Sequence, residues 1–296
     1  MTNVLQWIDG KDVPGDGPPL DITNPATAGV IGSLTEATRE QVEAAVSAAR
    51  GSFDSGVWAC TSHADRRATL RRVAEAIHDE ADALIGLQVS EGGMPPAQVR
   101  GHVMAAAGWF DYFADFLNRE AGESYRQLGA ATVLVEREPI GVCALFSPWN
   151  VPVGLSAIKL APALAAGNSV VLKPSEETPM VTRRLVDLVN GAGLPPGVLN
   201  YVNGRGAVTG AALSEARGID MISFTGGHLG GAAVAAAAAR RHVPCVMELG
   251  GKSATIVFED ADLDAALDGA LLAIYGNNGE ACLAGSRILV QERIAD

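Results

Sequence analysis

A small set of side chains in this sequence could carry out covalent chemistry, and a cysteine is the first of them. Cys282 lies in the run Gly279-Glu-Ala-Cys-Leu-Ala-Gly-Ser-Arg287, where its neighbours are small. Small neighbours let a substrate carbonyl come close, and a thiolate is the most reactive nucleophile among side chains. Most cysteines are nevertheless inert small hydrophobic residues. The run makes Cys282 a candidate nucleophile, with a purely structural cysteine as the alternative.

Two further side chains could support such a nucleophile. Glu248 ends an apolar run and is followed by paired glycines, and apolar surroundings suit a carboxyl group that acts as a general base near neutrality. Asn150 ends the run Ser147-Pro-Trp-Asn150, and its amide N–H can donate to a developing oxyanion. The plainer alternatives are a carboxylate without a role at a strand end and a helix N-cap.

A glycine-rich run could bind phosphate groups. Phe224-Thr-Gly-Gly-His-Leu-Gly-Gly231 follows a β-branched run and precedes an alanine-rich one, which predicts a strand, a turn and a helix. Glycines at 226, 227 and 231 would let a diphosphate approach the amides at the helix N-terminus. The run matches neither the Walker A pattern nor G-x-G-x-x-G, so a tight turn without a ligand explains it about as well.

An ammonium and a carboxylate stand together at the end of another predicted strand, in Lys173-Pro-Ser-Glu176. A carboxylate at such a position can accept both hydrogen bonds of an adenosine ribose diol and would repel a 2′-phosphate. A surface ion pair is the simpler interpretation of the same residues.

Apart from Cys282, which follows a helical pattern at 263–274, these side chains come at the ends of strands that the sequence pattern predicts. Short β-branched runs alternate with helical patterns at 154–166, 179–190, 207–215 and 231–240, and this alternation requires crossovers and a parallel sheet covered on both faces. Ligands of such doubly wound α/β domains lie beyond the carboxyl ends of the strands. The predicted strands are 132–136, 140–146, 169–172, 198–202, 221–224 and 243–247.

The N-terminal part is predicted to supply scaffold rather than chemistry. Proline and glycine cluster before residue 20, which indicates turns and short strands. Thr38 and Gln41 form a capping-box pattern ahead of a helical stripe, and apolar spacing predicts a core-facing helix at 96–117.

Composition excludes several classes of protein. Of the 296 residues, 48% are hydrophobic and 19% charged, which excludes a disordered chain, and no uninterrupted apolar run is long enough to span a membrane. The net charge of −12 speaks against nucleic acid and anionic lipid as partners. The four cysteines are too scattered for a disulfide framework or a metal site. With no leader pattern at the N-terminus, a cytoplasmic protein is expected.

Together, the five runs around Asn150, Lys173, Gly226, Glu248 and Cys282 resemble the aldehyde dehydrogenase superfamily in order and spacing. The resemblance covers the whole chain, from Trp7-Ile-Asp-Gly-Lys11 to Ser286-Arg287. It implies a Rossmann-like doubly wound sheet, and an NAD-dependent enzyme that oxidises an aldehyde or semialdehyde to a carboxylic acid.

The resemblance also implies catalytic roles. Cys282 would add to the aldehyde to form a thiohemiacetal, and Asn150 and the backbone N–H of Cys282 would hold its oxyanion. After hydride has left for the nicotinamide, Glu248 would activate the water that hydrolyses the thioester. Lys159 matches a buried lysine near that base and is expected to relay protons.

On the cofactor side, the resemblance places Ser147 and Trp149 near the nicotinamide half of NAD. It places Lys173 and Glu176 on the adenosine ribose, with Gly206 near the adenine. The diphosphate would lie on Gly226, Gly227 and Gly231. Glu176 favours NAD over NADP. Two departures from the family pattern, Gly227 in place of serine and Gly230 in place of a branched apolar residue, are expected to loosen cofactor binding.

The expected organisation is a dinucleotide-binding domain over residues 1–251 and the start of a truncated catalytic domain over 252–296. Segment 124–140 resembles the family's oligomerisation strand, which implies a homodimer or tetramer for the parent protein. The family's later Glu-x-Phe-Gly-Pro segment does not occur here, so the chain is expected to be the N-terminal portion of a longer one. The alternatives are a CoA-acylating relative, which needs no water-activating Glu248, and a non-catalytic cofactor-binding fragment.

Overall fold

The centre of the molecule is a mixed sheet whose strand order is β12-β11-β8-β9-β10-β2-β3. The computed structural model describes residues 2–119, 121–129 and 131–295. The first five strands are parallel, and they comprise β12 (Cys245–Leu249), β11 (Met221–Gly226), β8 (Val142–Ser147), β9 (Ser169–Pro174) and β10 (Leu199–Tyr201). This parallel sheet confirms the doubly wound α/β fold that the alternating pattern predicts.

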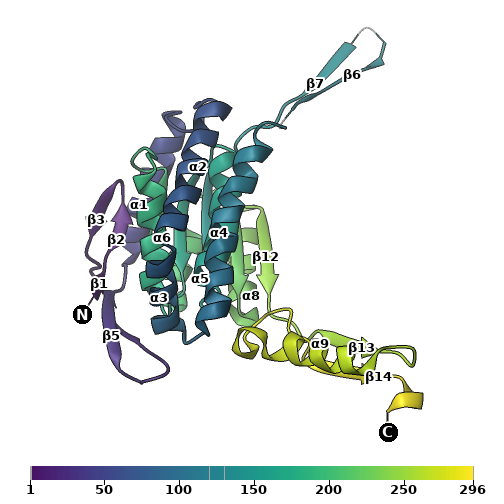
Figure 1. Cartoon of the computed structure of the whole chain (residues 1–296). Coiled ribbons are helices and arrows are strands. Elements are labelled where there is room, and N and C mark those ends of the chain that lie inside the picture. Colours follow the sequence, from purple (N-terminus) through teal and green to yellow (C-terminus); the bar gives the residue numbers. More distant parts are fainter. Residues whose placement is uncertain (1, 120, 130, 296) are drawn as a thin grey trace.

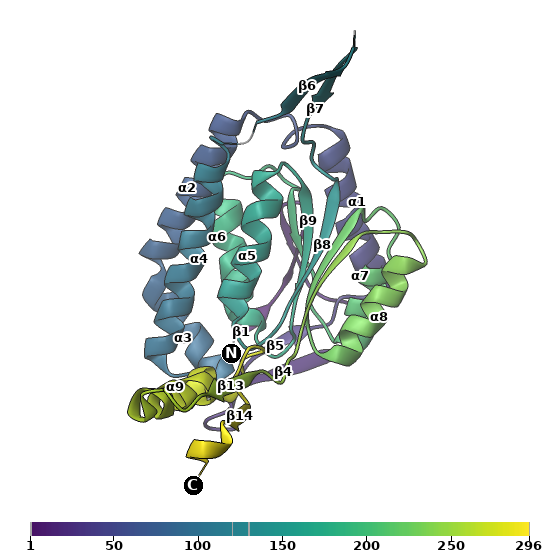
Figure 2. The same cartoon turned by 90° about the vertical axis from the view of Figure 1, so that its right-hand side faces the viewer.

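Helices cover both faces of the sheet (Figure 2). One face carries α1 (Arg39–Asp54), α7 (Ala211–Glu215) and α8 (His228–Ala239). The other carries α5 (Pro152–Ala165) and α6 (Pro179–Gly191), with α2 (His63–Asp79), α3 (Ala81–Gly92) and α4 (Pro96–Phe116) packed outside them. Two apolar cores result, one on each side of the strands.

The central strands are mainly apolar because successive residues enter different cores. In β8, Cys143 and Leu145 pack into the core under α5, while Ala144 and Phe146 pack into the core under α1 and α8. A strand buried on both faces is mainly apolar, and all residues of β8 and β9 are buried, with Ser147, Ser169 and Lys173 as the polar exceptions. This burial fixes the strand ends, and therefore the groups that follow them.

The N-terminal residues extend the sheet in a way that the sequence pattern does not predict. β2 (Gln6–Ile8) pairs antiparallel with β10, and β3 (Lys11–Val13) pairs with β2. A second sheet has the order β1-β5-β4, from β1 (Thr2–Val4), β4 (Pro19–Thr23) and β5 (Val30–Thr35). The capping box at α1 is confirmed, since the Gln41 N–H donates to Thr38 Oγ1 at 3.4 Å and the Thr38 N–H to Gln41 Oε1 at 3.1 Å.

A hairpin and a small C-terminal unit project from this body (Figure 1). The hairpin consists of β6 (Glu123–Leu128) and β7 (Ala131–Val135), and every residue of β7 is exposed. It overlaps the predicted oligomerisation segment, of which residue 130 lies outside the described residues. The C-terminal unit pairs β13 (Ala254–Val257) with β14 (Arg287–Val290) beside α9 (Leu263–Tyr275). Over the described ranges, no helix combines the length and apolar character needed to cross a membrane.

Candidate active site

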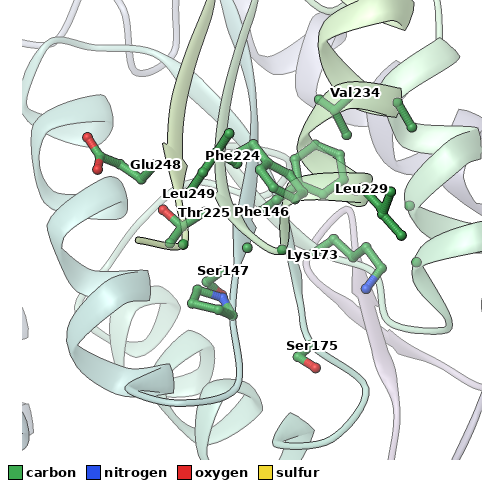
Figure 3. Close-up of a pocket in the computed structure, with 18 of the residues that line it drawn as sticks. Phe146, Ser147, Lys173, Ser175, Phe224, Thr225, Leu229, Val234, Glu248 and Leu249 are labelled. Atoms are coloured by element: carbon green, nitrogen blue, oxygen red, sulfur yellow. The ribbon is translucent and has the colours of Figure 1, made fainter. Parts of the chain in front are cut away.

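A cavity of about 1020 Å³ lies at the carboxyl ends of the parallel strands (Figure 3). This is the upper end of the sizes typical of ligand sites. It is lined by all the predicted site residues except Lys159 and Gly231: Ser147, Trp149, Asn150, Lys173, Glu176, Gly206, Gly226, Gly227, Glu248 and Cys282. Runs that are far apart in the sequence therefore meet in one place. Most of them lie at the ends of strands of the same parallel sheet, and the Cys282 run reaches the cavity from the segment between α9 and β14.

At one end of the cavity, a buried cation stands beside a carboxylate. Lys173 Nζ lies 3.5 Å from Glu176 Oε2 and donates to the carbonyl oxygen of Pro174 at 2.7 Å. Burial lowers the pKa of Lys173, while Glu176 and Glu36 act in the opposite direction. The Gly206 N–H donates to Glu176 Oε1 at 3.3 Å. The Glu176 carboxylate is therefore oriented, and part of its accepting capacity is left for a ligand.

The middle of the cavity is the turn from β11 into α8. Gly227 is the N-cap of α8, and no described side chain caps that end of the helix. A Cβ on Gly227 would meet no described heavy atom within 4 Å. Free amide groups and the positive end of the helix dipole thus border the cavity, and an anion could bind there.

Gly231 serves packing rather than the lining of the cavity. A Cβ at this position would lie 2.4 Å from Leu249 Cδ2. Only a residue without a side chain lets α8 approach β12 this closely. The sequence pattern grouped Gly231 with the diphosphate-binding glycines, whereas its neighbour Gly230 is the one that borders the cavity.

At the other end, the cysteine-bearing turn lies against Asn150. Asn150 Nδ2 donates to the carbonyl oxygen of Glu280 at 2.6 Å. The amide has a second N–H, which leaves one donor for a substrate oxygen. Cys282 is exposed and borders the cavity. A Cβ on Gly251 would stand 2.6 Å from the carbonyl oxygen of Cys282, so glycine is needed where the end of β12 meets this turn.

Glu248 and Lys159 lie on the α5 side of the sheet. Thr225 and Glu248 are paired across β11 and β12, and Figure 3 shows Glu248 pointing away from Phe224 and Val234. Lys159 is buried, does not line the cavity, and donates from its Nζ to Ser223 Oγ at 2.7 Å. Burial lowers the pKa of Lys159 to about 8, against the opposing effect of Glu248. Glu248 itself is exposed. The described residues therefore do not enclose its side chain in the apolar surroundings that the sequence led us to expect.

Ser147 and Trp149 follow β8 directly. Ser147 is buried and accepts a hydrogen bond from Ser156 Oγ at 2.8 Å, while Trp149 is 40% exposed. Ser147 is therefore tied to α5, and the indole of Trp149 is the freer of the two groups.

Sequence reasoning missed several groups that shape the site. The rings of Phe146 and Phe224 lie 5.8 Å apart and both border the cavity, as do Leu229 and Val234 on α8. Phe146 and Phe224 could have been predicted to border the cavity, because they lie near the carboxyl ends of strands, shortly before Ser147 and Gly226. Asn277, which links the cysteine-bearing turn to Asn150, had no comparable signal, because its partner is distant in the sequence. No group of three described His, Cys, Asp or Glu residues could hold a metal ion.

Comparison with known proteins gives consistent results. The profile of the aldehyde dehydrogenase family matches residues 13–296. Aldehyde dehydrogenase 1 of Tanacetum cinerariifolium is 41% identical over 294 residues, covering 98% of this chain and 59% of that protein. Betaine aldehyde dehydrogenase of Bacillus subtilis (strain 168) is 38% identical over 292 residues, covering 98% of this chain and 60% of that protein.

Solved structures show the same likeness. The NAD-dependent aldehyde dehydrogenase from Sinorhizobium meliloti superposes with a TM-score of 0.96 at 39% identity, over 100% of this chain and 59% of that one. Betaine aldehyde dehydrogenase from Staphylococcus aureus in complex with NAD+ gives 0.96 at 36% identity, over 99% of this chain and 58% of that one. The chain thus spans about 59% of the length of such relatives.

Proposed function

The chain belongs to the aldehyde dehydrogenase family, and we propose that it binds NAD+ and takes part in oxidising an aldehyde to a carboxylic acid through an adduct on Cys282. The observation that carries this proposal is the shared cavity. An exposed thiol, an amide donor, a carboxylate and an uncapped helix N-terminus all border it. A covalent oxidation needs these groups within reach of one substrate and one cofactor.

The residues around the cavity suit NAD+. The free amides of α8 at Gly227 fit a diphosphate, and the carboxylate of Glu176 fits a ribose diol. A 2′-phosphate would meet the negative charge of Glu176, which favours NAD+ over NADP+. When bound, NAD+ supplies the acceptor for the hydride that leaves the substrate carbon.

The chain's own side chains would divide the remaining work. The Cys282 thiolate forms the C–S bond to the aldehyde carbon, and the free N–H of Asn150 and the backbone N–H of Cys282 donate to the oxygen. Loss of hydride leaves a thioester on the sulfur. Glu248 then takes a proton from water, which attacks the thioester and releases the acid and the thiol. Lys159 lies beneath Glu248 and, with its pKa lowered to about 8 by burial, can exchange a proton near neutral pH.

We also propose the organisation that goes with this chemistry. Residues 1–251 form the dinucleotide-binding domain, and residues 252–296 form part of a catalytic domain. The exposed hairpin β6–β7 presents apolar side chains, among them Leu134 and Val135, and would pair with another copy in a homo-oligomer.

Cofactor binding is the first part to test, by isothermal titration calorimetry with NAD+. Glu176→Gln should weaken NAD+ binding about ten-fold, since a charge-assisted hydrogen bond is worth about 1.5 kcal/mol. Glu177→Gln changes the adjacent exposed carboxylate in the same way and should leave NAD+ binding unchanged. Equal affinities in all three proteins would remove Glu176 from the site.

The chemical step is tested by mixing the protein with NAD+ and an aliphatic aldehyde and recording NADH absorbance. We expect a burst that Cys282→Ser abolishes, while Cys245→Ser, which alters another exposed cysteine, keeps it. Glu248→Gln should keep the burst but stall afterwards. If wild-type protein binds NAD+ without any burst, the oxidation part of the proposal is wrong and a cofactor-binding module remains. Acceleration of turnover by coenzyme A would instead identify an acylating enzyme.

A further inference from the structure

A buried asparagine is one of the residues that join the Cys282 turn to the body of the protein. Asn277 lies in the turn Gly276–Gly279, between α9 and Cys282. Its side-chain Nδ2 donates to the carbonyl oxygen of Asn150 at 3.2 Å and to that of Glu280 at 3.5 Å. Its backbone N–H donates to Gln98 Oε1 on α4 at 2.7 Å. One residue thus contacts the oxyanion donor's backbone, the body helix α4 and its own turn.

The neighbouring Asn278 provides an internal contrast. Both asparagines have left-handed backbones, with φ of +55° at Asn277 and +58° at Asn278. Asn277 is buried, whereas Asn278 is exposed and its side chain makes a hydrogen bond to the Gly93 carbonyl oxygen at 3.2 Å. Backbone shape is therefore common to both, and the contact with Asn150 distinguishes Asn277.

The contact reaches the reacting groups through a closed set of bonds. Asn150 Nδ2 donates to the same Glu280 carbonyl oxygen that receives Asn277 Nδ2. Glu280 and Cys282 are two residues apart, and both border the cavity. If the Asn277 amide were lost, the Asn150 amide alone would hold this carbonyl, and the bond from Asn277 to the Asn150 backbone would be missing.

We infer that Asn277 is a positioning residue, which holds the Cys282 turn against Asn150 so that the thiol faces the cofactor cavity. The inference rests on the proposed function, because it gives the purpose of that alignment. Because these hydrogen bonds are internal to the chain, Asn277 should also hold the turn in the protein without cofactor.

The test uses variants of the two asparagines in the full chain. Asn277→Asp keeps the size of the side chain but replaces the N–H donor with an oxygen that faces two carbonyl oxygens. Asn277→Gly keeps the left-handed backbone accessible and removes the amide. Asn278→Asp makes the same chemical change at the exposed neighbour and serves as the matched control.

Two measurements follow on each protein. The first is amide hydrogen exchange over residues 279–283 without cofactor. The second is the rate at which iodoacetamide alkylates Cys282, mapped by peptide mass with and without saturating NAD+. The exposed Cys60 and Cys245 report general reactivity in the same molecules. Calorimetry gives the NAD+ affinity of each variant.

In wild-type protein and in Asn278→Asp, NAD+ should slow alkylation of Cys282 about ten-fold, whereas in both Asn277 variants the slowing should fall below about two-fold. NAD+ affinity and the reactivity of Cys60 should be unchanged, because the cofactor-binding strands are not touched. Exchange at 279–283 should rise about ten-fold in the Asn277 variants only.

The outcomes separate the two proposals. If NAD+ slows alkylation of Cys282 equally in the wild-type protein and in Asn277→Asp, the inference is overturned. The proposed function is unaffected by that result. If NAD+ binds to the wild-type protein but does not slow alkylation of Cys282, the thiol does not face the bound cofactor, and both proposals lose that alignment. Absence of NAD+ binding in wild type overturns the proposed function, and the exchange measurement then decides the role of Asn277 alone. Wild-type behaviour of Asn277→Gly would show that the backbone, not the amide, positions the turn, and would overturn the inference.

Discussion

The body up to Gly251 and the C-terminal unit from Lys252 onward both contribute residues to the cavity, but different interactions position those residues. In the body, Lys173 lies in β9, a strand whose residues are all buried between two apolar cores. In the C-terminal unit, the described hydrophobic residues that are buried are Val257, Ala270 and Ala284. Its helix α9 instead exposes five large apolar side chains, those of Leu263, Leu267, Leu271, Leu272 and Tyr275.

This difference shows that packing fixes the end of the cavity at Lys173, whereas hydrogen bonds fix the end at Cys282. Packed strands have few alternative positions, because any shift opens a cavity or a clash. A turn held by amide contacts, such as those of Asn277 and Asn150, opens at a lower free energy. The large exposed apolar face of α9 is typical of a surface that another part of a protein covers.

The largest effect that tests this comparison is a leucine truncation in each region. Leu160→Ala in α5 removes a fully buried side chain and should lower the free energy of unfolding by about 2 to 5 kcal/mol. Leu267→Ala in α9 removes one that is 59% exposed, and should change it by about 0.5 kcal/mol or less. Urea unfolding followed by circular dichroism measures both. Equal losses would mean that α9 is packed in solution, and the comparison would be wrong.

The sequence predicted the body better than the C-terminal unit for the same reason. The run 170–172 is apolar because both faces of its strand are buried, and burial leaves a pattern that can be recognised in one dimension. Since parallel strands end at one edge, the positions of Lys173 and Gly226 near each other followed from the pattern as well.

What the sequence could not give is the direction of individual contacts. Gly231 belongs to the same glycine-rich run as Gly226, yet it contacts Leu249, because the helix turns it away from the cavity. Asn277 and Asn150 are brought together by the path of the chain, which no local pattern encodes. The antiparallel addition of β2 to β10 depends in the same way on distant pairing.

The second effect concerns a charge inside the body. Burial lowers the pKa of Lys159 from its ordinary value of 10.5 to about 8. Between these values the unfolded chain binds more protons than the folded one, so stability should rise with pH across this window. From pH 8 to pH 9.5 the gain is about 2 kcal/mol relative to Lys159→Met, which lacks the titrating group.

Unfolding in urea at pH 7, 8 and 9.5 measures this gain. Lys252→Met, which changes an exposed lysine at the start of the C-terminal unit, should follow the wild-type pH dependence. A wild-type curve parallel to that of Lys159→Met would show that Lys159 is hydrated in solution, and the body would be less tightly packed than the comparison requires.

The third effect lies where the two regions touch. Gly251→Ala would place a Cβ 2.6 Å from the carbonyl oxygen of Cys282, so the turn must move away, at a cost of about 1 to 2 kcal/mol. Gly250→Ala meets no described atom within 4 Å and should cost less than about 0.5 kcal/mol. Hydrogen exchange over residues 280–284 should report the loss in the first variant and not in the second. If hydrogen exchange over residues 280–284 is the same in Gly251→Ala and Gly250→Ala, the Cys282 turn does not depend on its contact with Gly251.

The smallest effect asks whether the uncapped end of α8 is available to a ligand. In the C-terminal unit, Asp262 caps α9 by accepting from the Ala265 N–H at 3.1 Å, whereas Gly227 offers α8 no side chain. Gly227→Ser adds a hydroxyl in open space beside the free amides, and serine is a better N-cap than glycine by a few tenths of a kcal/mol. Because the hydroxyl can also donate to a diphosphate, NAD+ should bind about two- to five-fold more tightly, as measured by calorimetry. Gly227→Ala is the matched control, since it fills the same space without a donor. If both variants bind NAD+ alike, the helix end is not where the diphosphate lies, and the packed body would hold the cofactor by the Lys173 and Glu176 end alone.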